Sequence, residues 1–141
     1  MNIIKDRYEI AGLKCLMTTY YDRTRQQSLP YKAENMWTEE EADITIDLGQ
    51  EFYDKIHTET MPHTSFDNIE YIYTGSLFNR YLIIHNGCML HSSAVVVDGY
   101  AYLFSADSGT GKSTHTKLWV KHFGDKAFII NDDKPVLRLA E

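Results

Sequence analysis

The residues of this chain best suited to chemistry form one short run in its last third. The run reads Ala106, Asp107, Ser108, Gly109, Thr110, Gly111, Lys112, Ser113 and Thr114. It follows an apolar stretch, 100–105, and leads into a segment, 113–123, that we expect to be helical. A strand, a glycine-rich turn and a helix that opens on Lys-Ser are typical of a phosphate-binding P-loop. In such a loop, backbone N–H groups and the helix N-terminus face an anion.

The run also contains the side chains that a bound nucleotide needs. Lys112 is placed to reach the terminal phosphates, and the hydroxyl of Ser113 is placed to contact a magnesium ion. A lysine at the start of a helix opposes the helix dipole, and a bound anion removes that conflict. We therefore predict a nucleotide site at residues 106–114, although Ala106 stands where the usual pattern has its first glycine.

A pair of aspartates forms the second group. Asp132 and Asp133 follow a short apolar run, 127–130, downstream of the glycine-rich loop. Carboxylates at the C-terminal end of a strand beside a P-loop hold magnesium or take the proton of an attacking hydroxyl. Asn-Asp-Asp is also ordinary turn chemistry, so a polar turn is the alternative. Because the P-loop lies nearby, we favour the role of metal ligand or base.

His91 is the third candidate. Two apolar runs, 89–97 and 100–105, are joined by Asp98-Gly99, a strong signal for a two-residue β-hairpin. His91 lies seven residues before this turn and Ala106 seven residues after it, so the hairpin sets them opposite each other. The pattern predicts that the imidazole lies beside the phosphate loop; an ordinary strand histidine is the alternative.

The elements around these residues are less sharply marked. Asp67 followed by Glu70 has the form of a capping box at the start of a long helix, which Asn86-Gly87 would end. Upstream we expect a strand within 8–19, a half-buried strand at 42–48 and a short helix at 51–58. The fold class is α/β, with α+β character in the N-terminal part and a mixed sheet. We divide the chain into an N-terminal extension, 1–66, and a nucleotide-binding core, 67–141.

Composition limits the partners and the compartment. The chain has 141 residues and a formal net charge of −6, without a basic stripe that would bind nucleic acid. No apolar run is long enough to span a membrane, and no N-terminal run has the form of a secretory signal. Cys15 and Cys88 lie far apart and lack metal-site spacing, so we expect two reduced core thiols. These features predict a cytoplasmic protein with no membrane or nucleic-acid partner.

The combination of motifs resembles the HPr kinase and phosphoenolpyruvate carboxykinase superfamily. The resemblance covers roughly residues 67–139 and includes the Leu90-His91-Ser92-Ser93-Ala94 strand, the hairpin, the loop and the late Asp-Asp pair. It implies that ATP and Mg²⁺, or alternatively Mn²⁺, are bound. It further implies that Asp132 is the base for an acceptor hydroxyl, that Asp133 and Ser113 lie on the metal side, and that His91 lies near the metal or the γ-phosphate.

This resemblance favours an ATP-dependent kinase that phosphorylates a hydroxyl on a protein, a peptide or a small molecule. A carboxykinase-like enzyme and a sensor that binds nucleotide without turnover are the alternatives. The chain ends eight residues after Asp133, in the middle of an expected strand, so we expect a C-terminally incomplete core. The acceptor and homo-oligomerisation are left open.

Overall fold

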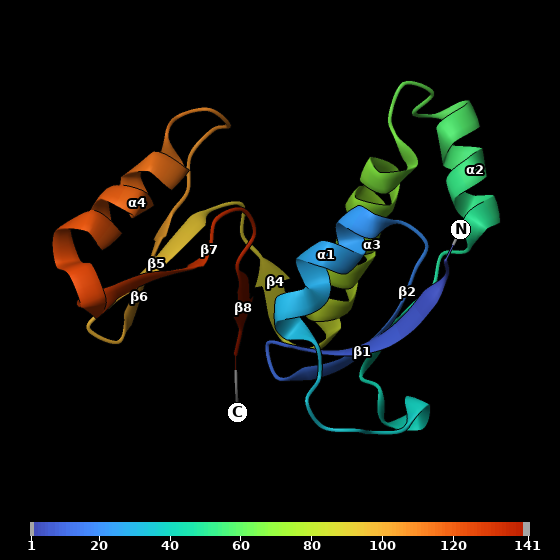
Figure 1. Cartoon of the computed structure of the whole chain (residues 1–141), viewed down its shortest axis with the longest axis horizontal. Coiled ribbons are helices and arrows are strands. Elements are labelled where there is room, and N and C mark those ends of the chain that lie inside the picture. Colours follow the sequence, from blue (N-terminus) through green and yellow to red (C-terminus); the bar gives the residue numbers. More distant parts are fainter. Residues whose placement is uncertain (1, 140–141) are drawn as a thin grey trace. The chain divides into compact units, whose positions relative to one another are not determined.

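The computed structural model describes residues 2–139, which form a mixture of helices and short strands (Figure 1). The strands are β1 (Ile4–Ile10), β2 (Leu13–Thr19), β3 (Ile44–Ile46), β4 (Gly87–Met89), β5 (Ser93–Val97), β6 (Tyr100–Phe104), β7 (Ala127–Asn131) and β8 (Val136–Arg138). The α-helices are α1 (Asp22–Ser28), α2 (Gln50–Glu59), α3 (Phe66–Ile84) and α4 (Lys112–Phe123). Three short 3-10 helices are η1 (Leu29–Tyr31), η2 (Glu39–Glu41) and η3 (Gly124–Lys126).

The chain divides into two compact units after Ile84. The predicted boundary at 66/67 is therefore placed too early, because it falls at the start of α3. This helix packs against α1, α2 and β3, so it belongs to the first unit. The α/β class is confirmed, but the strands form three separate sheets among the described residues, with orders β1-β2-β3, β4-β8 and β6-β5-β7.

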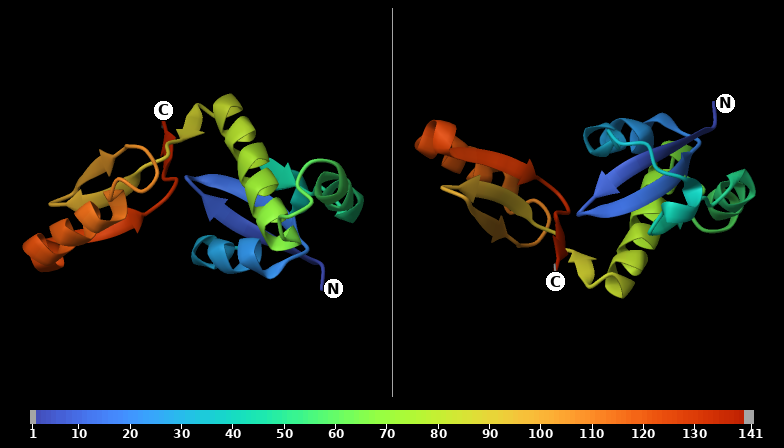
Figure 2. Two further views of the ribbon diagram at one scale, coloured as in Figure 1. Left: turned by 90° about the horizontal axis from the view of Figure 1, so that it is seen from above. Right: turned by 90° about the horizontal axis from the view of Figure 1, so that it is seen from below.

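The first unit is built on the β1-β2 hairpin, to which β3 adds in parallel (Figure 2). The sequence predicts one strand over 8–19, and this is wrong, since a turn at Ala11-Gly12 divides the segment. Both turn residues have positive φ, 53° and 73°, which a two-residue hairpin turn of this kind requires. Asparagine and glycine are the usual residues there, and the alanine gave no turn signal.

The predicted capping box at the start of α3 is also wrong. Asp67 lies inside the helix, and Glu70 is fully buried and directed elsewhere. The Glu70 carboxylate accepts hydrogen bonds from the backbone N–H groups of Tyr20, at 2.7 Å, and Tyr21, at 3.2 Å. It thereby caps the N-terminus of α1 rather than its own helix.

The second unit begins at His85 and has the three-stranded sheet β6-β5-β7 with α4 on one face. Alternate residues of β5, Val95 and Val97, form a small core with Ala127, and partly buried Phe104, Trp119 and Val120 pack against it. The Asp98-Gly99 hairpin is confirmed, with φ of 48° and 82°. The predicted strand 89–97 is instead two strands, β4 and β5, and β4 pairs with β8.

The two cysteines differ in their surroundings. Cys15 is buried in the first unit, as predicted, and burial raises the pKa of its thiol to about 12. Cys88 is exposed on β4, so the prediction of a second core thiol is wrong. Its strand, β4, belongs to a two-stranded sheet. Both faces of so small a sheet need not be covered, so a side chain on it can remain exposed.

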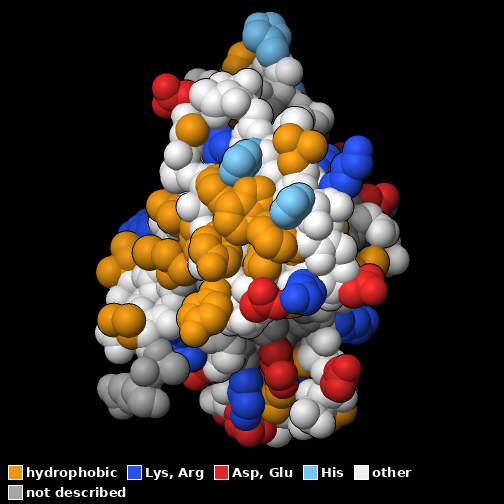
Figure 3. Space-filling view, turned by 90° about the vertical axis from the view of Figure 1, so that its left-hand side faces the viewer, with side chains coloured by type: hydrophobic (Ala, Val, Ile, Leu, Met, Phe, Trp, Pro, Cys, Tyr) orange, Lys and Arg blue, Asp and Glu red, His pale blue; other side chains and the backbone are white. Residues whose placement is uncertain are grey.

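Hydrophobic side chains remain on the surface of the second unit. Figure 3 looks onto the side at the left of Figure 1 and shows such side chains gathered there. The exposed large apolar residues of α4 and β6 are Tyr100, Tyr102, Leu118 and Phe123.

Candidate functional site

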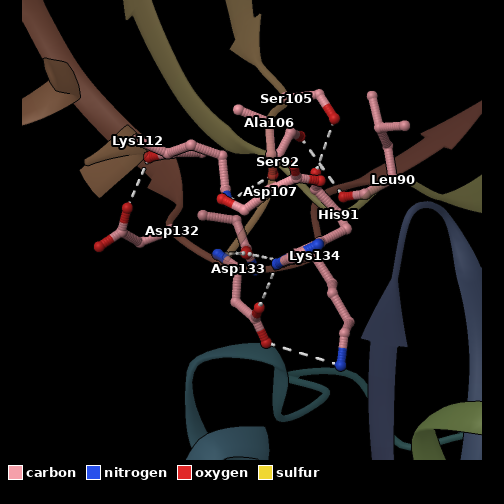
Figure 4. A network of polar contacts seen from close by, with 12 residues as sticks. Leu90, His91, Ser92, Ser105, Ala106, Asp107, Lys112, Asp132, Asp133 and Lys134 are labelled. Atoms are coloured by element: carbon pink, nitrogen blue, oxygen red, sulfur yellow. Dashed lines mark hydrogen bonds and ion pairs between the residues drawn. The ribbon is translucent and has the colours of Figure 1, made fainter. Parts of the chain in front are cut away.

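Three segments that are separate in the sequence meet at one edge of the β6-β5-β7 sheet. Strands β6 and β7 both run antiparallel to β5, so their C-terminal ends lie beside the N-terminal end of β5. The loop 105–111 follows β6, Asp132 and Asp133 follow β7, and His91 precedes β5. Figure 4 shows these residues close together with Lys112. The topology thus brings together the three groups of residues that the sequence singled out.

The loop between β6 and α4 has the backbone conformation that its glycines permit. Gly109 and Gly111 have φ of 82° and 94°, in the left-handed region, and Gly111 is the N-cap of α4. Ala106 is not among the residues with positive φ. Alanine therefore fits at the first position of the loop without backbone strain, and glycine is present at the two positions that need it.

Lys112 begins α4 and reaches back over the loop. Its Nζ donates hydrogen bonds to the carbonyl oxygens of Ala106, at 2.8 Å, and Asp107, at 3.0 Å. The Thr110 hydroxyl closes the same turn by donating to the carbonyl of Asp107 at 2.8 Å. The ammonium group and the N-terminus of α4 therefore place positive charge on the same loop, which favours an anion there.

Asp132 is connected to α4 through two buried hydroxyl groups. The Ser93 hydroxyl donates to Oδ1 of Asp132 at 2.5 Å and lies 2.8 Å from Oγ1 of Thr116. Ser93 and Thr116 are fully buried, whereas Asp132 is exposed. Thr116 lies one turn after Lys112, so this chain of hydrogen bonds joins the carboxylate to the helix turn that carries the lysine.

Asp133 lies between two basic side chains. Its Oδ1 is 3.8 Å from Nε2 of His91, and its Oδ2 is 3.7 Å from Nζ of Lys134. These distances exceed a hydrogen bond, and about half of each of the three side chains is exposed, so the pairs add little to stability. His91 lies just outside the β5-β6 ladder but beside the loop, where its carbonyl accepts a hydrogen bond from the Ser105 hydroxyl at 3.0 Å.

Ser93 and Thr116 are the members of this cluster to which sequence reasoning gave no role. Signals for both were present. Strand alternation puts Ser93 on the same face as Val95 and Val97, which is the face that α4 covers. Thr116 is four residues after Lys112 and so lies on the same side of the helix.

A metal ion at this site would depend on the nucleotide. Within residues 2–139, no group of three or more His, Cys, Asp and Glu side chains is arranged to hold a metal. Ser113 and Asp133 offer a hydroxyl and a carboxylate, which are the hard oxygen donors that Mg²⁺ prefers. Mg²⁺ commonly takes one or two protein ligands and completes its shell with phosphates and water, so these residues fit a nucleotide-bound ion.

No protein-family model matches the chain, and no curated protein or solved structure matches it. None of the helices in the described part of the chain is both long enough and apolar enough to cross a membrane.

Proposed function

We propose that the second unit binds ATP at the loop 106–114 and transfers its γ-phosphoryl group to a hydroxyl of a protein, a peptide or a small molecule. One observation carries this proposal. Asp132 is exposed at the edge where the loop lies, and it is joined through Ser93 and Thr116 to the helix that begins with Lys112. Phosphoryl transfer depends on positioning and charge. It therefore requires a base and a phosphate-binding lysine that are fixed relative to each other, as these hydrogen bonds would fix Asp132 and Lys112.

The residues have distinct roles in this proposal. The backbone N–H groups of the loop and Lys112 bind the β- and γ-phosphates, and Asp132 accepts the proton of the acceptor hydroxyl. Ser113 and Asp133 hold Mg²⁺, which supplies neutralisation of the charge on the transferring group. His91, beside Asp133, contacts the γ-phosphate side of the site.

The proposal is tested with γ-labelled ATP, Mg²⁺ and an array of serine, threonine and tyrosine peptides, with ADP formation measured in parallel. We expect Lys112→Ala to weaken ATP binding and abolish transfer. We expect Asp132→Asn to keep ATP affinity and to lower the transfer rate by about 10²–10⁴, the usual contribution of a general base. Asp125→Asn is the matched control, because Asp125 is an exposed aspartate in η3, outside the site.

Two results would overturn parts of the proposal. Unchanged ATP affinity in Lys112→Ala would exclude the loop as the nucleotide site. ATP binding that depends on Lys112, with neither ADP nor labelled peptide formed, would instead identify a sensor that binds nucleotide without turnover.

A further inference from the structure

A pocket of about 430 Å³ opens beside the loop in the second unit. Its walls are the end of β6, the loop and the first turn of α4, and they include Phe104, Thr110, Lys112 and His115. The pocket is shallow and largely open to solvent, so a ligand in it would rest against one wall. His91, Asp132 and Asp133 are not among the residues that line it. Ser105, Ala106, Thr110 and Gly111 of the loop also line it, so the pocket is continuous with the loop.

Aromatic rings form the wall of this pocket next to α4. The rings of Phe104 and His115 meet edge to face with centroids 4.5 Å apart. Behind them, Nε1 of Trp119 donates a hydrogen bond to Nε2 of His115 at 3.1 Å.

His115 is exposed, and it contacts both Phe104 and Trp119. Phe104 in turn packs against the core of the unit. Lys112 also lines the pocket. The aromatic part of the wall, Phe104 and His115, suits a flat ring, and Lys112 at the loop suits an anionic group.

We propose that this pocket holds the nucleoside part of the bound nucleotide, with its base against Phe104 and His115. The inference rests on the proposed function, because the phosphates of the same molecule occupy the adjoining loop. Thr110 and Lys112 line both the pocket and the loop, so one ligand can fill the two without a gap. The acceptor hydroxyl then approaches Asp132, which does not line the pocket.

The test compares two ligands on the full chain, Mg²⁺–ATP and Mg²⁺–tripolyphosphate, by titration calorimetry. His115→Ala is expected to weaken ATP binding about tenfold, the effect of losing one aromatic partner of a base, and to leave tripolyphosphate binding unchanged. His122→Ala is the matched control, because His122 lies on the last turn of the same helix and outside the pocket. It is expected to change neither affinity.

A spectroscopic measurement adds a second readout. Trp119 contacts both ring residues, so ATP is expected to quench its fluorescence and tripolyphosphate is not. Trp119→Phe identifies the share of the signal that comes from this residue, since the remaining tryptophan, Trp37, belongs to the first unit.

The outcomes separate the two proposals. ATP affinity within twofold of wild type in His115→Ala, or equal weakening of ATP and tripolyphosphate, overturns the nucleoside pocket while the phosphate loop stands. If wild type binds neither ligand, or if Lys112→Ala leaves both affinities unchanged, the proposed function fails and the pocket assignment fails with it.

Discussion

Replacing Ser93 with alanine removes the hydroxyl group that joins Asp132 to α4. Ser93 and its other partner, Thr116, are both fully buried. The Ser93 hydroxyl lies 2.5 Å from Oδ1 of Asp132 and 2.8 Å from Oγ1 of Thr116. A hydrogen bond to a charged acceptor contributes about 1.5–3 kcal/mol and a neutral one about 0.5–1.5 kcal/mol. These two contributions set the upper limit on the free energy of unfolding that the substitution can remove.

Two features of the structure reduce that cost. Asp132 is exposed, so water hydrates its carboxylate after the hydroxyl is removed. Oγ1 of Thr116 also donates a hydrogen bond to the carbonyl oxygen of Ser113 at 3.2 Å, and this bond remains in the variant. No buried group is left without a partner, and we expect Ser93→Ala to lower the free energy of unfolding of the second unit by about 1–2 kcal/mol.

The assay is urea unfolding of the full chain followed by the fluorescence of Trp119, in a Trp37→Phe background so that the signal reports the second unit. Ser92→Ala is the matched control, because Ser92 is equally buried but its hydroxyl makes one long bond, 3.4 Å, to the nearby carbonyl of Leu90. We expect it to cost about 0.5 kcal/mol or less.

Under the proposed function, the same variant also tests catalysis. Without the Ser93 hydroxyl, Asp132 is no longer held relative to α4, so phosphoryl transfer should slow while ATP affinity stays within about twofold, as expected when positioning alone is lost. Equal losses of stability in Ser93→Ala and Ser92→Ala, together with unchanged transfer, would refute the reasoning that the hydroxyl bridge positions the carboxylate.

Three further predictions concern other parts of the chain. Gly111→Ala should cost about 1–2 kcal/mol because φ is 94° there, whereas Gly75→Ala, in the middle of α3, should stabilise by about 0.5–1 kcal/mol; thermal unfolding of both variants tests this. A thiol reagent at pH 8 should label Cys88 within minutes and Cys15 only after unfolding, because Cys15 is buried with a pKa of about 12; mass spectrometry of the labelled chain decides. Burial raises the pKa of Glu70 above its usual 4.5, so the folded state holds this proton more tightly than the unfolded state. Wild type should therefore gain stability relative to Glu70→Gln as the pH falls from 8 toward 4.5, and a difference that does not change with pH would contradict this.

The second unit could be predicted largely from sequence because its signals are local. Asp98-Gly99 supplies the two positive φ values of its turn, so the hairpin and the position of His91 beside the loop follow from the spacing. The aspartates follow β7 directly, and the crossover through α4 brings them to the end of β6 where the loop begins. Chain order and turn chemistry together suffice for this arrangement.

The first unit could not be predicted in the same way, because its decisive contacts are distant in sequence. Glu70 binds backbone groups 50 and 49 residues upstream, whereas the capping-box pattern, which pairs residues three positions apart, assigned it to its own helix. Ala11 adopts a φ of 53° that alanine seldom adopts, so its turn carries no compositional sign. For Glu70 a tertiary contact overrides the local preference, whereas at Ala11 the turn is local but its residue type does not indicate it.

The backbone geometry of the loop explains why alanine fits at position 106, where the usual motif has glycine. A glycine is needed in a loop where φ is positive or where another group approaches too closely for a Cβ atom. Ala106 does not meet the first condition, since its φ is not positive. The two glycines that remain have φ values of 82° and 94° and nothing within 4 Å of an added Cβ, so conformation rather than space requires them. The backbone conformation of this loop therefore depends on Gly109 and Gly111, and the methyl group of Ala106 is no argument against the proposed phosphate site.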